Sequence, residues 1–236
     1  MLMFISKKCN ATYNHFFNIY DVNRKKTYLT LLLLILILII AIFSPAPSNY
    51  IDAIKEKTSL RGVDSLYDYT IPLLASFIIF YTFYEDYKNK MYELLSFYNS
   101  ESFNYIMFYR WFFYVSLFSL GSFITGIFYF RYTSFFDLTA ILLSLRFLPN
   151  ILFLSSLILF VTVITKNSYA GLFVTLSYVL FDYLSSARMF KYLSLGVHSN
   201  NFYYTISPFY YFINRLIIIL LSIFLLFISC KKSAKG

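Results

Sequence analysis

Ten consecutive residues, from Leu31 to Ile40, are all leucine or isoleucine. The apolar run extends from Tyr28 to Phe43, and Thr30 is its one clearly polar member. A helix that is apolar on every face has no side to present to water. Hydrocarbon suits it, because lipid offers the backbone no hydrogen-bond partners and does not penalise apolar side chains. The run therefore predicts a transmembrane helix.

The composition agrees with a membrane protein. The chain is 59% hydrophobic and 13% charged, against roughly 45–50% and 25% for an ordinary globular domain. A net charge of +9 does not indicate nucleic-acid binding here, because the cations lie between apolar segments, where a positive-inside bias explains them. The two cysteines, Cys9 and Cys230, lie at opposite ends of the sequence and indicate neither a disulfide framework nor a metal site.

The apolar segments predict an all-α polytopic membrane protein. We expect one membrane domain over residues 27–236, preceded by a cytoplasmic segment over residues 1–26. A cleaved signal peptide is a less favoured interpretation of the first apolar run, which is long and has no clean small-x-small cleavage site after it. The expected transmembrane helices are six, at about 27–43, 69–84, 109–130, 148–164, 168–181 and 208–229.

The distribution of lysine and arginine predicts the orientation of these helices. With the N-terminus inside, twelve cations fall on the cytoplasmic side and eight on the outer side, which is the sign that the positive-inside rule requires. An even number of spans then places both termini in the cytoplasm. We expect a multi-pass protein of the plasma membrane, and a usage rich in Lys, Asn, Ile and Phe but poor in Ala favours an AT-rich bacterial genome.

Three other segments are apolar without spanning. Residues 1–26 resemble an interfacial amphipathic helix, and a disordered tail is the alternative. Residues 137–146 either lie flat on the outer face or extend the fourth span into a helix kinked at Pro149. Residues 182–207, between the last two spans, predict short helices that do not cross the membrane, because charged and polar residues interrupt them.

The segment between the second and third spans carries the most specific pattern. Glu85 and Asp86 lie at the cytoplasmic end of the second expected span. Carboxylates at a helix C-terminus oppose the helix dipole, so this placement has a cost. Met91, Leu94 and Leu95 then form an apolar stripe at helical spacing beside charged residues. This predicts an amphipathic cytoplasmic helix held between two spans.

This arrangement resembles the permease subunits of ATP-binding-cassette type-2 transporters. The family has an acidic residue ending the second span, a Glu-Leu-Leu-Ser-like run, and a basic residue opening the third. Glu85, the run Glu93-Leu94-Leu95-Ser96, and Arg110 match these positions. The pattern departs at Lys90-Met91 and Phe97-Tyr98, where the family usually has a Gly-Thr-like pair and a proline.

The resemblance implies a six-span permease that pairs with a second permease and with separate ATPase subunits. It implies a role for Glu85, Asp86, Met91, Glu93, Leu94 and Leu95 in coupling to that ATPase. The chain has no Walker A run, no zinc-protease motif and no serine-hydrolase elbow. We therefore expect no enzyme activity and no cofactor in this chain, with ATP hydrolysed by a partner.

Two ionisable residues near the outer ends of the last spans form a second candidate. Asp182 ends the fifth span and Arg215 lies one to two turns into the sixth. Such residues are functional candidates by default, and either the two pair or each reaches the outer headgroups by itself. Gly171 and Thr175 in the fifth span form a small-xxx-small pair that permits close helix packing.

The expected function is an ATP-driven exporter subunit whose substrate, a peptide or a lipid, the sequence does not specify. One alternative is a membrane immunity or scaffold protein that does not transport. The other is an ion-coupled carrier, which the absence of a recognisable inverted repeat disfavours.

Overall fold

The structure is a computed structural model of the 236-residue chain. It describes residues 22–48, 66–88, 90, 92–93, 103–133, 135, 137–145, 147–185, 189–190, 192–197 and 208–233. Within these ranges the chain is helical and contains no strand. The predicted all-α class is therefore confirmed for the described part of the chain.

Long helices make up most of the described chain, and shorter turns of helix join some of their ends. The long helices are α2 (Val22–Phe43), α5 (Ile71–Lys88), α7 (Phe103–Tyr129), α9 (Leu148–Thr165), α10 (Ser168–Leu184) and α12 (Pro208–Ser233). The short elements are the π-helical η1 (Leu66–Thr70), α8 (Leu138–Leu145) and the 3₁₀-helical η2 (Leu195–Val197).

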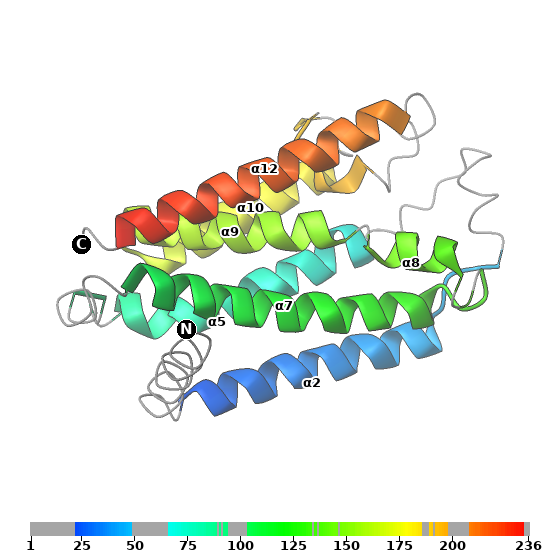
Figure 1. The fold of residues 1–236 in the computed structure, drawn as a ribbon, viewed down its shortest axis with the longest axis horizontal. Helices are drawn as coiled ribbons and strands as arrows, with labels where there is room; N and C mark the ends of the chain where they lie inside the picture. The colour runs from blue at the N-terminus through cyan, green and yellow to red at the C-terminus, as the bar shows by residue number, and fades with distance from the viewer. Residues whose placement is uncertain are drawn as a thin grey trace, which may run out of the picture.

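The long helices lie side by side, and each runs in the opposite direction to the one before it along the chain (Figure 1). The beginning of α2 and the end of α12 consequently lie at the same end of the bundle. Helix α9 lies at the centre, where it packs against α5, α10 and α12. More than half of its residues are buried, including Asn150, Ser155 and Ser156.

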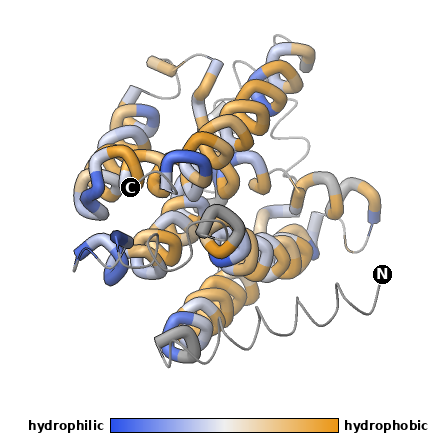
Figure 2. The backbone as a smooth tube through the Cα atoms, turned by 60° about the vertical axis from the view of Figure 1, so that its left-hand side comes forward, coloured by the Kyte–Doolittle hydropathy of each residue, from blue (hydrophilic) through white to orange (hydrophobic). Residues whose placement is uncertain are grey.

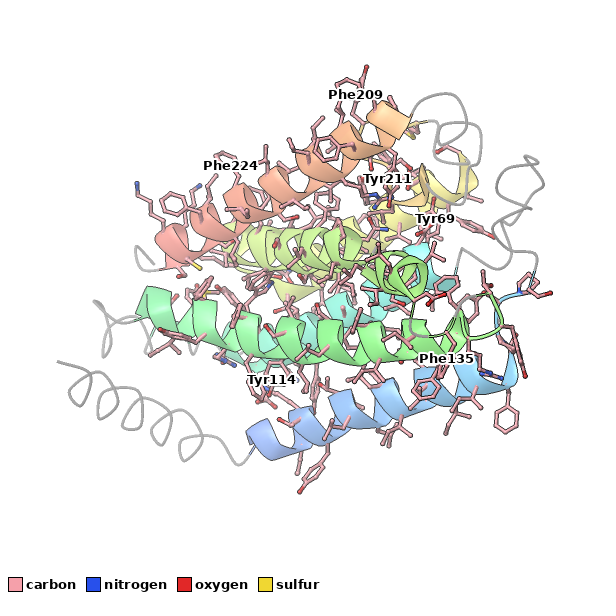
Figure 3. The ribbon with its side chains drawn as sticks, turned by 45° about the vertical axis from the view of Figure 1, so that its right-hand side comes forward. Tyr69, Tyr114, Phe135, Phe209, Tyr211 and Phe224 are labelled. Carbon is pink, nitrogen blue, oxygen red and sulfur yellow. The ribbon has the colours of Figure 1, made fainter. Side chains whose placement is uncertain are left out.

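Helix α10 places mostly small and polar residues inward, and large apolar residues of α10 and α12 point outward. The buried positions of α10 recur every three or four residues and are mostly small or polar, whereas Phe173 and Leu180 on its other faces are 72% and 56% exposed. Phe209 and Phe224 of α12 likewise point away from the bundle (Figure 3). The buried residues of α10 are Ser168, Gly171, Thr175, Val179 and Asp182.

Large apolar side chains also fill the interior between the helices, so the protein is apolar inside and outside, unlike a protein folded in water. Apolar residues continue along most of the length of the long helices, and hydrophilic residues gather at their ends (Figure 2). Several of the buried hydroxyl groups are satisfied by their own helices; Thr30, for example, donates to the carbonyl of Lys26 at 2.8 Å, and Ser222 donates to that of Ile218 at 2.6 Å. The surface is thus suited to lipid.

Four helical segments are long and apolar enough to cross a membrane, which is consistent with a membrane location. Helix α5 ends in Glu85, Asp86 and Lys88, and α10 has only 17 residues, so neither meets the same criterion. Six crossings thus stay a prediction, although a described helix covers each of the six expected spans. The four segments are Lys25–Phe43, Ile106–Tyr129, Leu143–Thr165 and Phe209–Ser233.

Glycine allows close approach between α9 and α10. A Cβ added at Gly171 would lie 2.3 Å from Thr162 Oγ1 and 2.7 Å from the carbonyl oxygen of Ile158. The close packing predicted for the Gly171 and Thr175 pair is confirmed at the glycine.

The three non-spanning segments are described in part. Residues 1–21 lie outside the described residues, and Val22–Lys26 form the first turn of α2. Residues 138–145 form α8, a helix separate from α9 that packs on α7, where Gly126 faces Ser144. Of the predicted short helices over 182–207, the described part contains η2.

Candidate functional site

The acidic residues that end α5 meet cations from two neighbouring helices. We call Lys26, Thr82, Glu85, Asp86 and Arg110 the helix-end cluster. Arg110 Nη1 of α7 donates to Asp86 Oδ2 at 2.5 Å, and its Nη2 donates to the carbonyl oxygen of Thr82 at 2.8 Å. Arg110 and Asp86 are 5% and 4% exposed, so their ion pair is shielded from solvent.

Helix α2 joins the same cluster through a buried lysine. Lys26 Nζ donates to the carbonyl oxygen of Thr82 at 3.1 Å and forms an ion pair with Glu85 Oε2 at 3.9 Å. Lys26 is buried, while the side chain of Glu85 is 43% exposed. Three helices therefore meet at one backbone carbonyl.

The position of this carbonyl explains why two cations are tolerated together. Thr82 lies one turn before Glu85 and Asp86, so the cations that bind its carbonyl also lie close to both carboxylates. Arg110 and Lys26 thereby compensate the carboxylates, whose placement at a helix C-terminus is otherwise unfavourable. Removing one partner of such a buried pair typically costs about 3–5 kcal/mol, because the other charge is left uncompensated.

Aromatic residues hold the beginning of the following loop against α5. Tyr92 stacks on Tyr87 with ring centroids 5.0 Å apart, and its hydroxyl donates to Glu93 Oε1 at 2.9 Å. The Lys90 backbone has a left-handed φ of 53°, and the N–H of Glu93 donates to the Lys90 carbonyl at 3.0 Å. Burial and the bond to Glu93 raise the pKa of Tyr92, so the phenol stays a donor. Glu93 is exposed, and Met91, Leu94 and Leu95 lie outside the described residues.

The second candidate lies at the opposite end of the bundle. Asp182 of α10 is fully buried, and the hydrogen bonds that described residues make to its carboxylate converge on one oxygen, Oδ2. The four donors to Oδ2 are the Tyr69 hydroxyl at 3.2 Å, Ser194 Oγ at 3.0 Å, the Leu195 N–H at 2.8 Å and the Gly196 N–H at 3.4 Å. Three of these donors, one hydroxyl and two backbone N–H groups, belong to one short stretch, residues 194–196.

Arg215 of α12 binds the same stretch from another side. Its Nη2 donates to the Leu195 carbonyl at 3.1 Å, its Nη1 donates to Asn150 Oδ1, and its guanidinium lies 5.0 Å from the centre of the Tyr211 ring. Asp182 and Arg215 do not form an ion pair with each other; they bind the N–H and the carbonyl of Leu195. Both side chains are buried instead of reaching headgroups independently.

Amide side chains that sequence analysis did not select complete this second site. Asn150 Nδ2 of α9 donates to the carbonyls of Leu195 and Asp68, each at 3.1 Å. Asn214 Nδ2 of α12 donates to those of Tyr192 at 2.8 Å and Ser194 at 3.2 Å. An asparagine inside an apolar helix is a signal that could have identified both, because hydrocarbon gives an amide no partner.

Position 196 has no room for a side chain larger than that of glycine. A Cβ at this position would lie 1.9 Å from the Tyr69 hydroxyl, the same hydroxyl that binds Asp182. Tyr69 and Tyr211 lie at the same end of the bundle (Figure 3). We call residues 192–197 the capping segment, because buried side chains from η1, α9, α10 and α12 surround it.

Comparison with protein-family models, curated proteins and solved structures finds no match to this chain. Function must therefore be argued from the two sites. Within the described ranges, no group of three His, Cys, Asp or Glu side chains is placed to hold a metal ion. In both sites, charged side chains form hydrogen bonds with backbone groups. This arrangement positions segments of the chain relative to one another.

Proposed function

We propose that this chain is the permease subunit of an ATP-driven exporter of the ATP-binding-cassette type 2. It would cross a bacterial plasma membrane six times, with both termini in the cytoplasm. The alternating directions of the helices and the common end of α2 and α12 support this topology. Helices α5 and α10 would cross as part of the bundle, with interfacial tyrosines at their ends.

The observation that carries the proposal is the ion pair between Asp86 and Arg110. This ion pair joins the end of α5 to the beginning of α7, so the segment that connects the two helices is anchored at one fixed point. Lys26 adds α2 to the same point. A push on the 85–96 segment would thus move three helices together, which is what transmission from a soluble ATPase requires.

The proposed partner contact is the apolar stripe of Met91, Leu94 and Leu95. This stripe would enter a groove on a separate ATPase subunit, as amphipathic helices commonly do. Glu85 is partly exposed and Glu93 is exposed, and both would contribute polar contacts at the rim. The lack of a nucleotide-binding motif in the sequence is the reason to place ATP on another chain.

The translocation path would lie between two permease subunits. Close packing around α9, with Gly171 against Thr162 and Ile158, fills the centre of one subunit with side chains. A path between two copies or homologues would use the outward apolar faces, which suit an amphipathic peptide or a lipid as substrate.

Co-purification tests the partner directly. The chain is co-expressed with an ATP-binding-cassette ATPase encoded beside it, and recovery of the ATPase is measured. Replacing Leu94 and Leu95 by alanine should weaken assembly by about 2–4 kcal/mol if both are buried in the contact. The matched control replaces Leu32 and Ile35, both 57% exposed on α2, and should recover ATPase like the unmodified chain.

The outcomes separate the candidate functions. Equal recovery with the Leu94 and Leu95 variant would show that the stripe is not the contact. No ATPase with the unmodified chain would favour a membrane immunity or scaffold protein.

One observation favours an ion-coupled carrier as a second candidate. Lys26, Asp86, Arg110, Asp182 and Arg215 are all buried, which is more buried charge than the sequence suggests, and intramembrane ionisable residues often form ion pathways. Proton or sodium uptake into proteoliposomes without ATP, lost in Asp182→Asn, would support this candidate over the exporter.

A further inference from the structure

The capping segment is a short piece of backbone that regular secondary structure does not hold in place. Only η2, a single 3₁₀ turn, lies within it. Its carbonyl groups are instead bound by side chains: Leu193 by the Tyr178 hydroxyl at 2.5 Å, Leu195 by Asn150 and Arg215, and Tyr192 and Ser194 by Asn214. Irregular backbone in a membrane protein is stable only where protein satisfies it in this way.

Nearly all of the bonds to these carbonyl groups come from outside the segment. Its own side chains contribute the hydroxyl of Ser194, which donates to Asp182, and Leu195, which packs in a buried cluster with Leu154 and Ile218, whereas Tyr192 is 50% exposed. The backbone of the segment is thus held by a few polar groups of the surrounding helices. Those groups are charged in two cases, Asp182 and Arg215.

Asp182 accepts more of these hydrogen bonds on a single atom than any other group described above. One oxygen, Oδ2, receives the bonds from Ser194, Leu195 and Gly196, together with the Tyr69 hydroxyl of η1. No described residue donates a hydrogen bond to its other oxygen, Oδ1. Loss of this carboxylate would leave four donors without their acceptor at once, three of them on the capping segment.

We propose that the capping segment is a movable closure at this end of the bundle, and that Asp182 and Arg215 form the latch that keeps it shut. Asp182 binds the N–H of Leu195 and Arg215 binds its carbonyl, so the two charges grip a single residue from α10 and α12. When the latch is released, the segment leaves the bundle and the interior beneath Leu195 becomes accessible, while the helices keep their packing. The proposal is independent of whether an ATPase binds the chain.

Cysteine accessibility tests the latch on the full chain. Cys9 and Cys230 are replaced by serine, and single cysteines are placed at Leu195, Tyr192 or Ile158. Leu195 and Ile158 are fully buried and Tyr192 is exposed. The protein is held in phosphatidylcholine nanodiscs, which leave both faces open to a water-soluble maleimide, and the labelling rate is measured at each position.

The latch predicts different rates at the three reporters. With Asp182 and Arg215 intact, Leu195→Cys should label far more slowly than Tyr192→Cys. Asp182→Ala should accelerate labelling at Leu195→Cys by about tenfold or more, the change in an opening equilibrium expected when a buried acceptor is removed. Asp182→Asn, which keeps an acceptor oxygen but not the charge, should give an intermediate rate. Ile158→Cys, in the middle of α9 and in a different buried cluster from Leu195, should stay protected in every variant.

Two results would overturn the proposal. An unchanged rate at Leu195→Cys in both Asp182 variants would show that the carboxylate does not hold the segment. Parallel acceleration at Ile158→Cys would show that Asp182 supports the whole bundle and not a separate closure. Asp137→Ala, at an exposed carboxylate beside α8, is the matched control and should change none of the rates.

Discussion

Gly121 and Gly171 both lie at helix contacts, but a methyl group added at each would meet different atoms. At Gly121 the nearest atoms are the side-chain methyls of Leu34, at 2.6 Å, which can rotate away. At Gly171 they include the backbone carbonyl of Ile158, at 2.7 Å, which cannot move without shifting α9. The absence of a side chain is therefore required for the helix contact at Gly171 but not at Gly121.

Alanine substitutions at the two glycines should consequently have different effects. Gly171→Ala should lower the free energy of unfolding by about 1–3 kcal/mol through overpacking between α9 and α10. Gly121→Ala should be close to neutral, because the better helix propensity of alanine, worth about 1 kcal/mol, offsets a small rearrangement of Leu34. Thermal unfolding of the purified variants in one detergent compares them, and equal melting temperatures would contradict this account.

At the residue level, the sequence indicates which side chains are unusual but not which partners they take. Glu85 and Asp86 are adjacent and equally plausible partners of Arg110, yet they point about 100° apart around a helix. Asp86 faces Arg110 and is buried, whereas Glu85 faces Lys26 and is partly exposed. Where a helix is apolar on most faces, its pattern does not reveal its rotation, so neither this choice nor the meeting of Asp182 with Leu195 could be predicted.

At the level of elements, the helix-end cluster joins α2, α5 and α7 at the carbonyl of Thr82. The expected spans locate these helices well but miss their ends. Helix α7 begins at Phe103, whereas the apolar run suggests about 109. Hydropathy detects only the part of a helix that needs lipid, and the first turns of α2, with Lys26, and of α7, over residues 103–108, lie outside it.

A double-mutant cycle measures how strongly the cluster couples α5 to α7. Asp86→Ala and Arg110→Ala should each cost about 3–5 kcal/mol, because each leaves the other charge buried without its partner. The double variant should cost less than the sum, by at least about 1 kcal/mol. Unfolding in mild detergent with increasing dodecyl sulfate provides the free energies. Additive costs would mean that the pair does not couple the two helices.

At the level of the whole molecule, the exposed lysines of the described residues gather at one end of the bundle. The start of α2, the end of α5, the turn between α9 and α10 and the end of α12 all lie there (Figure 1). Each carries exposed lysines, whereas Asp137 is exposed at the other end. The exposed lysines are Lys25, Lys88, Lys90, Lys166, Lys231 and Lys232.

This asymmetry yields a prediction about topology, because loops rich in Lys and Arg remain in the cytoplasm. In a chain with Cys9 and Cys230 replaced by serine, a cysteine at Ser48 should react with an impermeant maleimide on intact cells. Cysteines at Ser96 and Lys235 should react only after the cells are opened. Ser48 follows α2 directly and is exposed, so its reaction reports the outer end of the first span.

Each departure from this pattern identifies a different error. Labelling at Ser96 but not at Ser48 would show that the protein has the opposite orientation in the membrane to the predicted one. Labelling of Lys235→Cys on intact cells, with Ser48 labelled and Ser96 protected, would mean an odd number of crossings. The 182–207 region would then contain a further span, and the capping segment could not close the outer end of the bundle. Labelling at Ser48 together with protection at Ser96 and Lys235 is the result that agrees with six alternating helices and cytoplasmic termini.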